Sequence, residues 1–136
     1  MERLKAAGEE AVKRFQPEAD ATYCNVAVSY IAKQLGYQGF VALLANQIVA
    51  KMKSSPDFAE VKAEAAQKLA NDGKLVVAGI QDEPHGHVAV VAPGKAITSP
   101  KWRGALAPLV YNCGKKNGLM GANYAFGAEP KYWALI

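Results

Sequence analysis

The sequence has few of the residues that disulfide frameworks and membrane spans require. Only two of its 136 residues are cysteine, Cys24 and Cys113, which is too few for a disulfide framework but leaves a single bridge open. No apolar run approaches the ~18 residues of a membrane span, and residues 1–15 carry charges throughout, unlike a signal peptide. We therefore expect a protein made in the cytoplasm without a signal peptide, and no membrane partner.

Basic charge is present but thinly spread. The formal net charge is +4, yet the lysines are scattered and no arginine-rich stripe with interleaved aromatic residues occurs, so we expect no nucleic-acid partner. A length of 136 residues with 51% hydrophobic composition suits one compact core. We expect a single domain over residues 1–136 and a monomer.

Helical periodicity dominates the first half of the chain. Apolar residues recur at helical spacing over residues 2–15, and again from Cys24 to Leu35 before Gly36. Residues 40–53 predict a third helix. Ser55, Pro56 and Asp57 have the order of a helix start, which predicts a fourth helix running to Gly73.

Short apolar runs typical of strands replace helical periodicity after Gly73. Residues 74–80 and 87–91 flank a polar turn, as adjacent antiparallel strands do. Residues 108–113 predict a third strand, residues 114–127 show no amphipathic period, and residues 131–136 form a last strand or a packed tail. The expected fold class is α+β, with N-terminal helices packed on a small antiparallel sheet.

One cysteine and one histidine have the placement that thiol catalysis requires. Cys24 lies in the first turn of a predicted buried helix, where the positive end of the helix lowers a thiol pKa. His87 opens a predicted strand whose alternation puts Ala89 and Val91 on its own face, which leaves the imidazole room to reach a thiol. The pair predicts a nucleophile and its base, and alkylation of Cys24 that stays fast at pH 6.

Two other interpretations of these side chains stay open. Cys24, His85, His87 and Cys113 have the ligand types of a zinc site, although no closely spaced cysteine pair is present. Alternatively Cys113 is the nucleophile, but the segment that follows it does not predict a helix that would activate the thiol. We favour Cys24 and His87, with no metal and no cofactor.

Several segments together resemble a known family. The stretches "TYCNVAVSYIAKQLGY", "ANQIV", "AQKLANDGKLVVAGI" and "GHVAVVAPG" are similar to the NlpC-type, papain-like cysteine peptidases of bacterial cell walls, and most closely to the amidase effectors of type VI secretion systems. The resemblance runs from about residue 20 to Cys113 and is weaker in the first helix and after Gly114.

The resemblance implies a fold, a substrate and a set of site residues. It implies a papain-like fold without a cofactor, cleaving the peptide stems of peptidoglycan, commonly between D-glutamate and meso-diaminopimelate. Cys24 and His87 match the family's cysteine and histidine, and Asn25 stands where the family often has serine. The orienting position matches Cys113 by its "CG" step, while the adjacent Asn112 is chemically the better orienter; the sequence does not decide between them.

Further expectations depend on the same resemblance. Asn46 and the loop around Gln38 and Gly39 line the substrate groove by analogy, although a solvated helix position is the simpler interpretation of Asn46. An effector implies an immunity protein as partner, and export or injection to reach the periplasm or wall; phage-type lysis is another route. A thiol acyltransferase and a non-catalytic zinc- or wall-binding module are the alternative functions.

Overall fold

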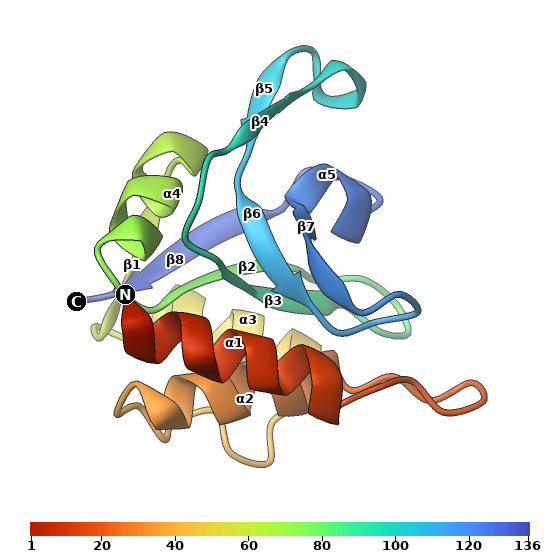
Figure 1. Ribbon diagram of the computed structural model, residues 1–136. Helices are drawn as coiled ribbons and strands as arrows, with labels where there is room; N and C mark the ends of the chain where they lie inside the picture. The colour runs from red at the N-terminus through yellow and green to blue at the C-terminus, as the bar shows by residue number, and fades with distance from the viewer.

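The computed structural model describes all residues 1–136 as helices packed on an antiparallel sheet, so the expected α+β class is confirmed (Figure 1). The helices are α1 (Glu2–Arg14), α2 (Cys24–Gln34), α3 (Ala45–Ser54), α4 (Ala63–Asn71), the short α5 (Ala122–Ala125) and the 3-10 turn η1 (Pro100–Trp102). The strands are β1 (Phe58–Val61), β2 (Val76–Ile80), β3 (His87–Val91), β4 (Ile97–Ser99), β5 (Ala105–Ala107), β6 (Leu109–Asn112), β7 (Gly118–Gly121) and β8 (Lys131–Leu135).

Six strands form the main sheet in the order β1-β8-β2-β3-β6-β7, and every neighbouring pair is antiparallel. The C-terminal strand β8 inserts between β1 and β2, with Val77 opposite Trp133. Residues 131–135 are therefore a strand rather than a packed tail. Strands β4 and β5 pair separately and project from the body as a ribbon (Figure 1).

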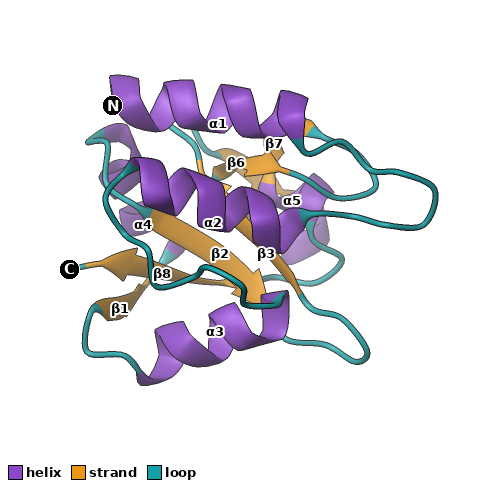
Figure 2. Ribbon diagram, turned by 90° about the horizontal axis from the view of Figure 1, so that it is seen from below, coloured by secondary structure: helices purple, strands orange, loops and turns teal.

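Helices α1, α2 and α3 lie side by side across one face of the sheet, and α4 lies across the other (Figures 1 and 2). A cluster of 35 buried residues joins these layers, including Leu4 of α1, Ile31 of α2, Ile48 of α3 and Val90 of β3. Helix α2 and strand β3 are thus fixed in the interior, and their first residues are Cys24 and His87.

Two predicted helix starts were wrong. Residues 55–62 do not begin a helix. Ser55 is the C-cap that follows α3, residues 58–61 pair with β8 as the edge strand β1, and α4 starts only at Ala63. Phe58 is buried against Phe40, with ring centroids 5.5 Å apart, and this packing competes with the helical pattern. Likewise α3 starts at Ala45, because Ala42 has a φ of 65°, which interrupts a right-handed helix.

Among the elements that follow β3, the sequence predicted β6 and gave β8 as one of two alternatives, but it did not predict the others. Strands β4 and β5, the turn η1, strand β7 and helix α5 are each only three or four residues long, below the length at which periodicity identifies an element. Residues 114–127, which show no amphipathic period, contain β7 and α5. These short elements place Phe126 beside His87.

Candidate active site

Cys24 is the first residue of α2, at the positive end of the helix. The preceding residue, Tyr23, provides no side-chain cap, so the first N–H groups of the helix stay available for a ligand. The Cys24 side chain is only 8% exposed. The backbone N–H groups of Cys24 and Asn25 both hydrogen-bond the thiolate form of the sulfur. An anion that forms at this position therefore finds donors already in place.

A third backbone donor to Cys24 comes from the sheet. The N–H of Val88 hydrogen-bonds the Cys24 sulfur, and Val88 directly follows His87 in β3. The nucleophile candidate is thus held at the beginning of the strand that carries the base candidate. Packing of α2 on β3 brings these two chain segments together.

The pKa of Cys24 differs from the sequence-based expectation. Burial raises the pKa of this thiol above its ordinary value, and the backbone hydrogen bonds from Val88, Asn25 and Cys24 itself oppose that rise without cancelling it. Desolvation disfavours the thiolate more than the helix end favours it. The resting side chain is therefore a neutral thiol. A base must remove its proton for the sulfur to act as a nucleophile.

His87 and Asn112 form the best-defined contact of the site. His87 Nε2 lies 2.6 Å from Asn112 Oδ1, and Asn112 Nδ2 donates to the Lys116 carbonyl at 2.9 Å. Because the amide nitrogen is used by that carbonyl, Oδ1 is the acceptor and His87 Nε2 carries the hydrogen. The other ring nitrogen of His87, Nδ1, then holds a free lone pair that can accept a proton.

The surroundings of His87 keep its imidazole neutral. The ring packs against Phe126, with centroids 4.8 Å apart at an interplanar angle of 59°. Desolvation lowers the pKa of His87 below 6.5, and the hydrogen bond that His87 donates to Asn112 opposes this by raising the pKa. A neutral imidazole with a free Nδ1 lone pair is the form that a general base requires. Phe126 was missed because residues 114–127 carry no periodic pattern.

Cys113 lies on the opposite side of the sheet from Asn112. Its thiol donates to the Ala11 carbonyl of α1 at 3.5 Å and is 1% exposed. Burial, with a smaller contribution from the charge of Cys24, raises the pKa of Cys113 to about 12. Of the two candidate orienters, the structure therefore places Asn112 on the imidazole and Cys113 in the core. A nucleophilic role for Cys113 is unsupported by this position.

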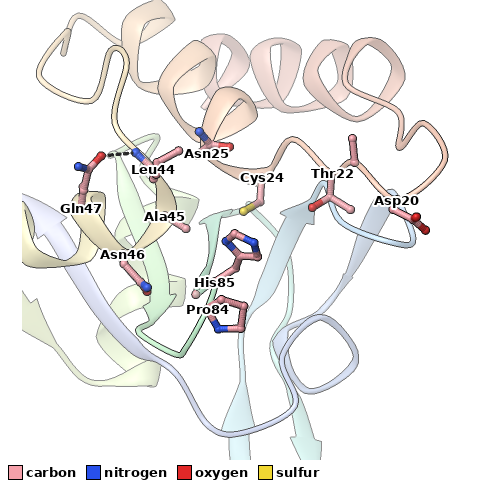
Figure 3. A pocket seen from close by; sticks show the side chains of 12 residues that line it. Asp20, Thr22, Cys24, Asn25, Leu44, Ala45, Asn46, Gln47, Pro84 and His85 are labelled. Carbon is pink, nitrogen blue, oxygen red and sulfur yellow. Dashed lines mark hydrogen bonds between the residues drawn. The ribbon is translucent and has the colours of Figure 1, made fainter.

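Cys24 opens into a cleft of about 370 Å³ (Figure 3). One wall is the segment before α2 and the start of α2, the second is the start of α3, and the third is the loop between β2 and β3. The lining residues are Asp20, Ala21, Thr22, Cys24, Asn25, Leu44, Ala45, Asn46, Gln47, Pro84, His85 and Gly86. Half of the lining residues carry polar side chains, which can hydrogen-bond the peptide groups of a substrate, and the rest of the lining is apolar or small.

Asn46 has a more specific role than a solvated helix position. Its Nδ2 donates to the Asp82 carbonyl at 2.8 Å, its Oδ1 accepts from the Asp82 N–H at 3.2 Å, and its carbonyl accepts from Gln81 Nε2 at 3.1 Å. Asn46 thus ties the first turn of α3 to the β2–β3 loop while lining the cleft. Gln38 and Gly39, proposed with it, lie beyond the C-terminal end of α2 and do not line the cleft, because the helix carries the chain away from Cys24.

The four residues of the zinc alternative do not come together. His85 is exposed in the cleft, His87 is turned to Asn112, and Cys113 faces α1. No group of three or more His, Cys, Asp or Glu side chains is placed to hold a metal ion. The arrangement of the donors therefore gives no support to a Cys2His2 site.

Comparison with known proteins leaves the family open. No family model matches the chain, and no curated protein matches it. None of the helices is both long and apolar enough to cross a membrane.

Proposed function

We propose that the protein is a papain-like cysteine amidase of the NlpC type that cleaves the peptide stems of peptidoglycan. The observation that carries the proposal is the His87–Asn112 hydrogen bond of 2.6 Å at the beginning of β3, where the Val88 N–H contacts Cys24. A thiol, an imidazole and an amide in this order form the nucleophile, base and orienter of thiol acyl transfer. The sequence resemblance supplies the substrate class.

The reaction begins with proton transfer within the pair. His87 Nδ1 takes the proton of the Cys24 thiol as the sulfur attacks the amide carbonyl, and the carbonyl oxygen becomes an oxyanion. The N–H groups of Cys24 and Asn25 at the start of α2 stabilise that charge. Proton transfer during attack fits the raised pKa of Cys24 and the lowered pKa of His87, since neither group is charged beforehand.

The tetrahedral intermediate then collapses to a thioester, which water hydrolyses in a second step. The C–N bond breaks, and the leaving amine takes the proton from His87 Nδ1, which leaves a thioester on Cys24. His87 next removes a proton from water, and the resulting attack cleaves the C–S bond to release a carboxylic acid. The proton that His87 took from water passes to the Cys24 sulfur and regenerates the thiol. The cycle needs no cofactor. Asn112 keeps the imidazole in one tautomer throughout.

The bond that we propose for cleavage joins D-glutamate to meso-diaminopimelate, and the biological role is that of an antibacterial effector or lysis enzyme. Such an effector reaches the wall by export or injection and has an immunity protein as partner. Digestion of purified peptidoglycan, with mass spectrometry of the released muropeptides, tests the proposal. Products of that cleavage from wild type, absent with Cys24→Ala, support it. Unchanged peptidoglycan with both proteins contradicts it.

A further inference from the structure

The cleft contains one basic side chain that the proposed chemistry does not use. His85 is exposed on the β2–β3 loop, and Figure 3 shows its imidazole and the Cys24 sulfur pointing into the same cleft from different walls. His87, two residues later, turns instead toward Asn112. The two histidines therefore have separate positions, one at the base of the strand and one facing the space that a substrate would occupy.

The loop that carries His85 is fixed in place rather than free. Asn46 bonds both backbone groups of Asp82, and Lys53 Nζ donates to Gln81 Oε1 at 3.0 Å. Gly86 closes the loop so tightly that a Cβ there would overlap Asn46 Oδ1 and the Ile80 carbonyl. Because both ends of the loop are attached to the body, His85 is held over the cleft at little further entropic cost on binding.

The charges around His85 define what it can bind. Among the residues lining the cleft, His85 is the only basic one and Asp20 the only acidic one; the remaining polar side chains are neutral. Asp82 and Glu83 lie on the same loop but line the neighbouring hollow, and Lys115 lies with Asp20 in the hollow on the other side. An imidazole N–H donates to a carboxylate in either protonation state, and the bond is strongest when the ring is charged.

From this placement we propose that His85 binds a free carboxylate of the substrate beside the scissile amide. The substrate class is then a peptide with a carboxylate next to the bond attacked by Cys24, and Asn46 is a positioning residue that holds His85 there. This inference rests on the proposed function, because it assumes that the cleft binds the peptide cleaved by Cys24. The inference adds to that function the chemical group, a free carboxylate, by which the enzyme selects its substrate.

Two synthetic stem peptides provide the test, one with the free α-carboxylate of D-glutamate beside the scissile amide and one with the corresponding carboxamide. Wild type is expected to cleave the carboxylate peptide with a KM roughly tenfold lower, as one charge-assisted hydrogen bond implies. His85→Gln should cleave both peptides with similar KM. His85→Lys should restore the preference.

Binding to the inactive Cys24→Ala variant, measured by calorimetry, separates recognition from chemistry. Tighter binding of the carboxylate peptide that disappears when His85→Gln is added supports the inference. A preference that survives His85→Gln but disappears with Lys115→Met assigns the carboxylate to the neighbouring hollow and overturns the inference.

The two proposals fail in different ways. Equal cleavage of both peptides by wild type overturns the role of His85 and leaves the proposed function standing. Cleavage of neither peptide overturns the proposed function and the role of His85 with it.

Discussion

His87 donates its Nε2 hydrogen to Asn112 Oδ1 across 2.6 Å, and the same amide donates to the Lys116 carbonyl. This relationship determines which nitrogen of the imidazole is free, and so which side of the ring acts as the base. It also distinguishes the role of Asn112 from that of the adjacent Cys113, whose thiol faces α1.

Asn112 and Cys113 should respond differently to truncation. Asn112→Ala should lower kcat on the order of 10²-fold, the lower end of what acid–base catalysis contributes, because the imidazole loses its fixed tautomer. Cys113→Ala should keep kcat and lower the free energy of unfolding by about 1 kcal/mol, as loss of a small buried side chain does. Steady-state kinetics and urea unfolding of both variants provide the measurement.

A conservative variant distinguishes positioning from mere folding. Asn112→Asp retains an acceptor oxygen and adds a negative charge, which raises the pKa of His87. We expect partial activity with the acid limb of the rate profile moved to higher pH. An acid limb that stays in place, with the same loss as Asn112→Ala, would show that Asn112 has only a structural role.

The pH dependence of catalysis follows from the two shifted pKa values. Protonation of His87 removes the base, and desolvation lowers the pKa of His87 below 6.5, so activity should be lost only as pH falls below 6.5. Burial raises the pKa of Cys24 above its ordinary 9.0, so the neutral pair should persist to at least pH 9. A kcat/KM profile measured from pH 4 to 10 should be flat between these limits. A profile centred on pH 5 would contradict this account.

Thiol alkylation tests the protonation state of the resting enzyme. With its pKa raised by burial, Cys24 should react slowly with iodoacetamide at pH 6 and faster as pH passes 9. Cys113, whose pKa is about 12, should react only after unfolding. Mass mapping of reduced, alkylated peptides measures both sites. Fast labelling of Cys24 at pH 6 would instead indicate the preformed thiolate that its place at a helix start predicts.

Packing at Gly86 gives a prediction about stability. Gly86→Ala should lower the free energy of unfolding by roughly 1–3 kcal/mol, because the added Cβ would meet Asn46 Oδ1 and the Ile80 carbonyl. Gly127 is a matched control, since a Cβ there would have no neighbour within 4 Å. Gly127→Ala should change stability by less than about 0.5 kcal/mol. Equal denaturant midpoints for the two variants would show that the loop adapts.

The sequence predicted those parts of the fold that long periodic segments encode. Helices α1 and α2 and strands β2 and β3 agree with the predicted segments within a few residues, so the convergence of Cys24 with the start of β3 was foreseeable. Phe58 shows why other parts were not: its spacing suits a helix, but pairing with β8, more than 70 residues later, makes it a strand residue. Such long-range pairing leaves no local signal.

The candidate site was predictable only to the level of residue type. The sequence named Asn112 and Cys113 as the two candidate orienters, but the choice between them depends on which of the two faces α1. The thiol pKa was misjudged because a helix end is visible in the sequence, whereas the burial that outweighs it is a tertiary property. The only sequence feature that pointed to a site role for Asn46 was its position in the "ANQIV" segment.

The central claim is that Cys24 forms a thioester with the substrate. The most direct measurement is mass spectrometry of the protein quenched in acid during turnover of a stem peptide, followed by mapping of the modified residue. The account predicts an acyl adduct on Cys24, present in wild type and lost in both Cys24→Ala and His87→Ala. An adduct on Cys113, or peptide cleavage that persists in Cys24→Ala, would contradict it.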